Sequence, residues 1–179
     1  ARKAPALQGP SWGKVREPMV RMVQWARTFG VTSKTGRWEM WNYSDELGQS
    51  PLRSESVFNF FRPGYVPPKT AMSAAQLVAP EFQIVNESTL AATINMTRAF
   101  LLGWTDAQSS YSQHLALAAD PAKLVNQLNL TLTANQLSPK IVQLITDTVT
   151  QSVQPKNALL RVHMASFLIM VCPEYTVQK

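Results

Sequence analysis

The chain has 179 residues, of which 45% are hydrophobic and 16% charged, and its formal net charge is +6. The charged fraction lies below the roughly 25% that is usual in soluble domains, and this excludes a disordered chain, which needs high charge and few apolar groups. No apolar run approaches the ~18 residues of a membrane-spanning helix, and one cysteine with two histidines argues against a disulfide framework and a structural zinc site.

The positive charge belongs to the first part of the chain. Residues 1–70 hold 11 Lys and Arg against 5 Asp and Glu, whereas residues 71–179 hold 6 of each kind. These cations are spread out and form neither a dense stripe nor a known nucleic-acid-binding motif. We therefore expect a solvated basic surface, or a face that docks on an acidic partner, and no nucleic-acid ligand.

The N-terminal residues predict an arm followed by a helix. Residues 1–13 contain proline and glycine without periodicity, which indicates an extended arm, and residues 14–179 are expected to form a single helical domain. Pro18 suits the first helical position, where its missing N–H needs no partner, and Gly30 suits the residue beyond the end.

This first helix is expected to be amphipathic. Its apolar residues recur at helical spacing: Val15, Met19, Met22, Val23, Ala26 and Phe29. Arg16, Arg21 and Arg27 lie off this stripe, so we expect them to face water.

Residues 31–72 predict a long ordered loop that wraps the helices. They hold several large rings interrupted by glycine and proline: Trp38, Trp41, Phe58, Phe60, Phe61 and Tyr65. Each ring can bury ~150–250 Å², and such a loop is ordered only if its rings pack against other elements. One short helix is expected near Ser56–Phe60.

From Ser73 onward the chain is predicted to be helical. Short turns are expected over Ser73–Leu77 and from Pro80. Ser88 is the expected N-cap of a helix that ends before Gly103. The expected apolar positions of that helix are Leu90, Ala91, Ile94, Leu101 and Leu102.

Four further helices complete the prediction, the first over Tyr111–Ala118. Asp120 with Pro121 and Ser138 with Pro139 each combine an N-cap residue with proline at the first helical position. The last helix, over about Lys156–Val171, is apolar on most sides, which is typical of a central core helix. We therefore expect an all-α fold, an irregular helical bundle with a long ordered aromatic-rich loop.

Five segments of the chain resemble one protein family. They are KVREPMVRMVQWARTFG (14–30), LGQSPLRSESVFNFFRPGYVPP (47–68), APEFQIVNESTLAATINMTRAFL (79–101), LVNQLNLTLTANQLSPKIVQLITDTV (124–149) and MASFLIMVCPEYTVQK (164–179). They resemble the C-terminal part of the bacterial exported family catalogued as domain of unknown function 1800.

This resemblance implies a location and a setting, but no activity. Members are long exported proteins, often encoded beside a second exported family that resembles sulfatases, and no accepted catalytic residues or cofactor come with them. The chain is then expected to be the C-terminal portion of a larger protein that is periplasmic, on the cell surface or secreted. The implied partner is the remaining N-terminal portion of the same protein or another exported protein.

The candidate binding residues centre on a turn. Pro63–Gly64 is a turn signal, and Arg62 and Tyr65 beside it can present a guanidinium and a phenol to an anion or a sugar. Alternatively, Arg62 pairs with Glu55 or Glu81 and braces the loop.

Three amide side chains allow a structural and a functional interpretation. Gln49, Asn59 and Gln83 can stitch the loop to the helices, because buried amides need partners, or they can line a carbohydrate groove with Trp38 and Trp41.

The sequence contains no local catalytic signature. His163 is expected in the core, Cys172 is expected to be inert, and no serine lies in a hydrolase nucleophile motif. We expect no catalytic residue, metal or cofactor, and a structural or interaction role for this chain rather than enzyme activity on its own. The alternative is a carbohydrate- or anion-binding part of an enzyme completed by the N-terminal region. Its contacts would be Trp38, Trp41, Arg62, Tyr65 and Glu81.

Overall fold

The computed structural model of this chain describes residues 12–38 and 44–179. The predicted helical character is confirmed. The longer helices are α1 (Pro18–Thr28), α4 (Glu87–Leu101), α6 (Pro121–Leu128), α7 (Pro139–Ser152) and α8 (Ala158–Met170). Shorter helical segments connect them: α2 (Ser44–Leu47), α3 (Ala71–Ala74), η3 (Pro80–Gln83), α5 (Ser112–Leu115), η4 (Asn129–Thr133) and α9 (Pro173–Thr176).

Two small antiparallel sheets correct the all-α expectation. β1 (Lys14–Val15) pairs with β4 (Val177–Gln178), so the residues before α1 are tied to the end of the chain. β2 (Thr32–Ser33) pairs with β3 (Ala107–Gln108) and joins the segments that follow α1 and α4. Each strand is two residues long, and the two strands of each sheet lie far apart in the sequence. The predicted arm falls almost wholly outside the described residues.

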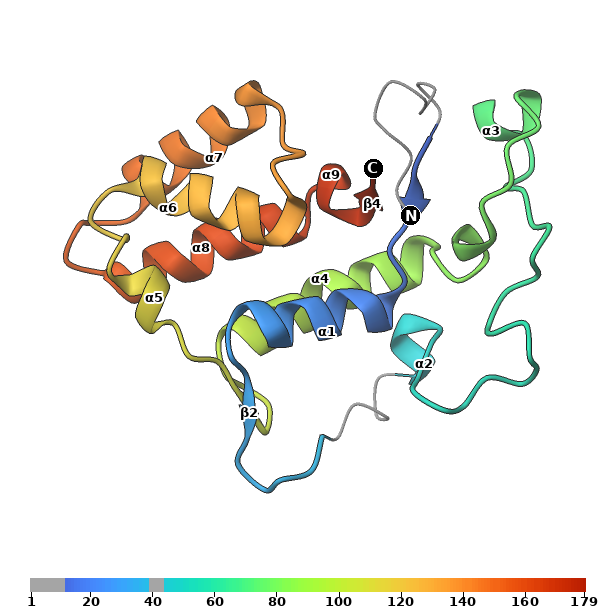
Figure 1. Cartoon of the computed structure of the whole chain (residues 1–179), viewed down its shortest axis with the longest axis horizontal. Helices are drawn as coiled ribbons and strands as arrows, with labels where there is room; N and C mark the ends of the chain where they lie inside the picture. The colour runs from blue at the N-terminus through green and yellow to red at the C-terminus, as the bar shows by residue number, and fades with distance from the viewer. Residues whose placement is uncertain (1–11, 39–43) are drawn as a thin grey trace.

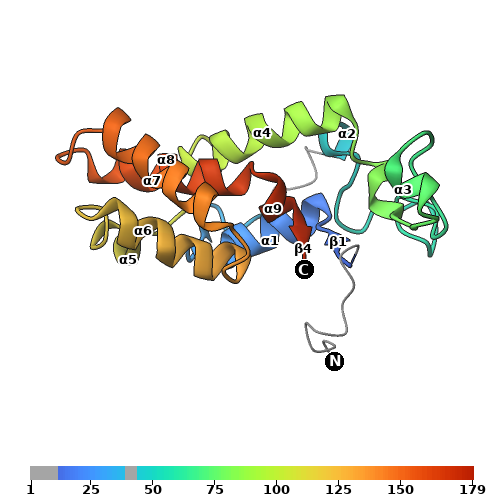
Figure 2. The same ribbon diagram turned by 90° about the horizontal axis from the view of Figure 1, so that it is seen from above.

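The helices form a group at one end of the molecule, and the 48–85 segment extends from the other (Figure 1). α6, α7 and α8 pack against one another, and α8 also packs on α4. The view from above shows α4 and α1 on opposite sides of the layer that α8 and α9 occupy (Figure 2). No helix within residues 12–38 and 44–179 has the length and apolar character of a bilayer span.

The core is built on aromatic and aliphatic side chains from these helices. Trp25 of α1 stacks on Phe100 of α4 with ring centroids 4.4 Å apart. Leu128 of α6 and Val149 of α7 are fully buried, as is Val162 of α8. The central place predicted for the last helix is therefore confirmed for most of its length, although its first turn is exposed.

The N-terminal signals predicted for two helices are confirmed. The Asp120 carboxylate accepts a hydrogen bond from the Lys123 N–H at 3.1 Å, and the Ser138 hydroxyl accepts one from the Ile141 N–H at 3.4 Å. Both helices start with proline at the next position. These signals work locally, so they are readable from sequence.

The predicted buried face of α1 is confirmed for Met22 and Phe29 and wrong for Val23. Val20 and Val23 are exposed, whereas Arg21 and Trp25 are buried. Trp25 has the largest apolar area on the helix, and the face that buries it carries the residue four positions earlier inward too.

Arg16, which precedes α1, is also buried rather than facing water. Its guanidinium donates to the Leu132 carbonyl at 2.9 Å and to Gln24 Oε1 at 2.7 Å, and it lies over the Tyr175 ring. Arg27 is exposed, as expected.

The predicted cap and apolar face of α4 are also corrected. Asn86 caps the helix in a reciprocal pair with Thr89, in place of Ser88. Thr93 and Thr97 are buried on the inner face, and their hydroxyls donate to the carbonyls four residues earlier at 2.7 and 2.8 Å. Because those hydroxyls are satisfied within the helix, threonine takes the inner positions, while Leu90, Ile94 and Leu102 are exposed.

Candidate functional site

The segment that follows α2 leaves the helices through a glycine. Gly48 has a φ of +66°, and a Cβ there would lie 3.3 Å from the Ile84 Cβ. Only glycine accepts this conformation without strain and also allows the close approach to Ile84. The chain is thereby directed outward into the 51–63 segment, which we call the outer loop.

The base of the outer loop is held by the start of α1. The Glu17 carboxylate accepts hydrogen bonds from Gln49 Nε2 at 2.6 Å and from Asn59 Nδ2 at 2.8 Å. Gln49 Oε1 accepts one from the Met19 N–H at 3.1 Å, and the Gln49 side chain is buried. The prediction that amides stitch the loop to the helices is confirmed for these two residues.

The far end of the outer loop is fixed to η3. The Arg62 N–H donates to Gln83 Oε1 at 2.8 Å, and the Tyr65 N–H donates to the Arg62 carbonyl at 3.0 Å across the Pro63–Gly64 turn. The side-chain pairing expected of Arg62 is wrong for the described residues, where it forms no ion pair with Glu55 or Glu81. Glu81 is instead buried and pairs with Lys14 Nζ at 3.6 Å.

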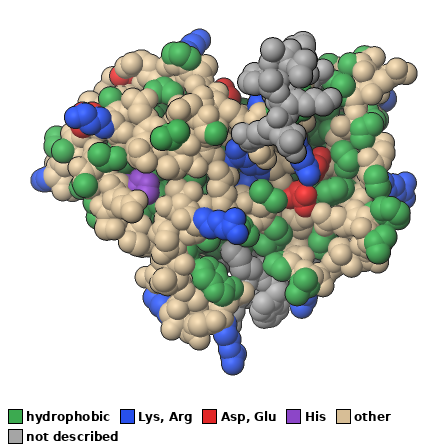
Figure 3. All heavy atoms as spheres, viewed as in Figure 1, with side chains coloured by type: hydrophobic (Ala, Val, Ile, Leu, Met, Phe, Trp, Pro, Cys, Tyr) green, Lys and Arg blue, Asp and Glu red, His purple; other side chains and the backbone are tan. Residues whose placement is uncertain are grey.

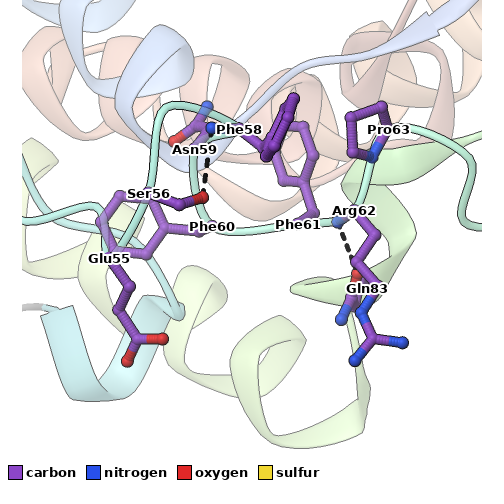
Figure 4. A pocket seen from close by; sticks show the side chains of 9 residues that line it. All are labelled: Glu55, Ser56, Phe58, Asn59, Phe60, Phe61, Arg62, Pro63 and Gln83. Atoms are coloured by element: carbon purple, nitrogen blue, oxygen red, sulfur yellow. Dashed lines mark hydrogen bonds between the residues drawn. The ribbon is translucent and has the colours of Figure 1, made fainter.

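A surface pocket of about 510 Å³ lies along the outer loop. Its lining is Glu55, Ser56, Phe58, Asn59, Phe60, Phe61, Arg62, Pro63 and Gln83. Arg62 and Gln83 lie together at one end, and Glu55 lies at the other (Figure 4). The pocket combines aromatic faces with a guanidinium, a carboxylate and two amides. This surface suits ligands that carry polar groups and can also stack on the phenylalanine rings.

Of the four candidate binding residues that the structure describes, Arg62 alone lines this pocket. Arg62 lines it, whereas Tyr65 and Glu81 do not. Trp38 is exposed and follows β2, and Trp41 lies outside the described residues. The three phenylalanines of the lining were expected to be packing residues. Their spacing in FNFF is the signal that could have indicated a shared surface.

The expectation that the aromatic-rich loop buries its rings is wrong for Phe58 of the outer loop, whereas Phe60 and Phe61 are half-buried. Leu52 is fully exposed, and Val57 and Phe58 are 94% and 60% exposed. The predicted short helix at Ser56–Phe60 is absent; an isolated bridge between Ser56 and Asn59 stands in its place. Polar contacts at both ends hold the outer loop, so its apolar side chains need not point inward.

His114 is buried and His163 is half-buried, and both rings pack on aromatic side chains. The His114 ring lies 5.0 Å from the Phe29 ring, and the His163 ring lies 4.9 Å from the Tyr111 ring. Burial lowers the pKa of both histidines. Within the described residues, no group of three or more His, Cys, Asp or Glu side chains could hold a metal ion.

Burial raises the pKa of the Cys172 thiol, which disfavours the reactive thiolate. This agrees with the inert role expected for that residue.

No curated protein and no solved structure matches this chain. A family model matches residues 2–177, which is nearly the whole length, and its description is "Protein of unknown function (DUF1800)". This agrees with the resemblance carried by the five segments quoted above. The chain belongs to the DUF1800 family.

Proposed function

We propose that this chain is an interaction part of an exported protein, and that the outer loop is the surface with which it binds a protein partner. The observation that carries the proposal is the exposure of Leu52, Val57 and Phe58 on a loop that is held at both ends. Hydrophobic side chains gather along the edge of the molecule that this segment forms (Figure 3).

The energetics favour a partner that covers these three side chains. Full burial of a leucine, valine or phenylalanine side chain contributes about 1.5–3 kcal/mol. Grouped exposed apolar side chains on a folded protein are typical of interaction sites. Because hydrogen bonds already fix the loop, little conformational entropy is lost when the partner binds.

The charges nearby indicate the chemistry of that partner. Arg53, Arg62 and Lys69 are exposed on the 51–69 stretch, whereas Glu55 is the acidic residue among them. A complementary surface is apolar with Asp or Glu at its rim. The N-terminal portion of the same protein, or another exported protein, is the partner that the family resemblance favours. Export to the periplasm, cell surface or medium belongs to this proposal.

A peptide selection tests the proposed surface. A random peptide library is panned against the chain, and the dissociation constants of selected peptides are measured by fluorescence anisotropy. We expect peptides that place apolar residues beside Asp or Glu. The triple variant Leu52→Ser, Val57→Ser, Phe58→Ser should bind them at least about tenfold more weakly.

The matched control is Leu144→Ser, which changes an exposed leucine on α7. It should bind the selected peptides like the unmodified chain. Equal binding by the triple variant, or an equal loss in the control, would contradict the proposed surface.

The 510 Å³ pocket supports a second candidate function, carbohydrate or anion binding. Phenylalanine faces can stack on sugar rings, and Gln83, Asn59 and Arg62 supply hydrogen bonds to hydroxyl or acidic groups. A glycan array with an Arg62→Ala control tests this candidate. Glycans that bind the chain and lose binding in the variant would support it, and an array without any bound glycan would refute it.

A further inference from the structure

Arg21 is a buried cation that forms no ion pair within residues 12–38 and 44–179. Its side chain is 7% exposed, and its Nε–H is shielded from solvent without a hydrogen-bond partner among the described residues. The two ion pairs in that part of the chain join other residues. A buried charge is normally paired or hydrogen-bonded, since its lost hydration is otherwise uncompensated.

A second unpartnered donor borders the same cavity. Trp25 follows Arg21 by four residues, so both lie on one face of α1. The Trp25 indole N–H is buried and has no partner among the described residues either. Thr93 and Thr97 of α4 also line the cavity and carry hydroxyl groups. The two residues that carry these unpartnered N–H groups therefore line a single space between α1 and α4.

This cavity is small, and none of the described residues that line it is acidic. Its volume is about 10 Å³, which is room for one particle of water size. The rest of its lining is apolar or aromatic: Pro18, Met22, Met96, Phe100, Met170 and Tyr175. Burial lowers the pKa of the Arg21 guanidinium, the direction expected of a cation without a compensating anion.

We propose that the cavity between α1 and α4 binds one small inorganic anion of the chloride type, held by Arg21 and Trp25. A water molecule could accept the same two hydrogen bonds, but it would leave the positive charge uncompensated. An anion satisfies both donors and the charge together. Either threonine hydroxyl can rotate from its helix carbonyl to donate a further hydrogen bond. This site is independent of the outer loop and of the proposed function.

Thermal unfolding at constant ionic strength tests the proposal, with chloride replacing gluconate, which is too large for the cavity. An anion that binds only the folded chain stabilises it by mass action. With a dissociation constant of about 1 mM, a change from ~1 to ~100 mM chloride raises Tm by about 5–9 °C. Arg21→Met should abolish this rise, and Arg27→Gln, a change at an exposed arginine of the same helix, should preserve it.

Chloride-35 NMR provides a readout that does not require Arg21→Met to fold. Fast-exchanging chloride should give a broadened line with the unmodified chain, and Trp25→Phe should reduce the broadening because one donor is lost. Equal Tm values in chloride and gluconate would overturn the proposal. Stabilisation by formate without stabilisation by chloride would also overturn it, because the site would then select a carboxylate.

Discussion

Glu17, at the start of α1, accepts a hydrogen bond from Asn59 at 2.8 Å, although the two residues are 42 positions apart in the chain. The same carboxylate oxygen accepts the hydrogen bond from Gln49. One acidic side chain therefore joins the start of α1 to Gln49, which precedes the outer loop, and to Asn59 within that loop. The most exposed apolar side chains of that loop rely on this polar contact for their position.

Replacement of Glu17 should release the outer loop. Glu17→Ala leaves the buried Gln49 amide with fewer partners, and we expect a loss of about 1–2 kcal/mol in the free energy of unfolding. Chymotrypsin should cleave more rapidly near the phenylalanines of residues 58–61. Urea unfolding and limited proteolysis measure the two effects. Glu46→Ala, at an exposed position of α2, is the control, and an equal cleavage rate in both variants would contradict this role.

Gly48 offers a test of backbone geometry. Gly48→Ala places a methyl group 3.3 Å from the Ile84 side chain at a positive φ, and Gly36→Ala has a positive φ with open space around it. Both variants should lose about 1 kcal/mol for the left-handed backbone, and Gly48→Ala should lose more because of the contact. Denaturant unfolding compares them. A larger loss in Gly36→Ala would refute the importance of the contact.

The stacked pair Trp25–Phe100 should dominate the contact between α1 and α4. Phe100→Ala removes a buried ring whose centroid lies 4.4 Å from its partner, and we expect a loss of about 3–5 kcal/mol in the free energy of unfolding. Leu144→Ala on the exposed face of α7 should change stability by no more than ~0.5 kcal/mol. Urea midpoints provide the comparison, and similar losses in the two variants would contradict the packing described.

Stability should fall on mild acidification because of His114, which is buried, and His163, which is half-buried. Burial lowers the pKa of His114 and His163, so below their usual pKa near 6.5 the unfolded chain binds more protons than the folded chain. Stability is then complete above that pH and decreases as the pH falls toward the folded-state pKa values. Urea unfolding at neutral and mildly acidic pH measures the slope. His163→Gln should flatten it, and an unchanged slope in that variant would contradict the contribution of this residue.

Local signals in the sequence determined where several helices begin and end. Asp120 and Ser138 cap helices through hydrogen bonds to residues three positions away, and Gly30 ends α1 with a positive φ of 52°. These contacts lie within one helical turn, so the residues that make them can be read from the sequence. The family was likewise predictable from the sequence.

Tertiary packing decided which further side chains α1 and α4 bury. Spacing favoured Val23 of α1 as a core residue, whereas the stack of Trp25 on Phe100 turned Arg21 inward instead. The face of α4 was also misassigned, since an intrahelical hydrogen bond satisfies each buried threonine hydroxyl.

The outer loop and the Arg21 cavity depend on distant residues in the same way. Glu17 meets Asn59, and Arg21 and Trp25 meet Thr93 and Thr97, only after the chain has folded. A pattern within a few residues carries local hydrogen bonding and periodicity. It does not show which area a partner helix will cover or which charge will be left without a counterion. For this reason the sequence determined the class of fold and the N-caps of α6 and α7, and the tertiary structure decided the surfaces and sites.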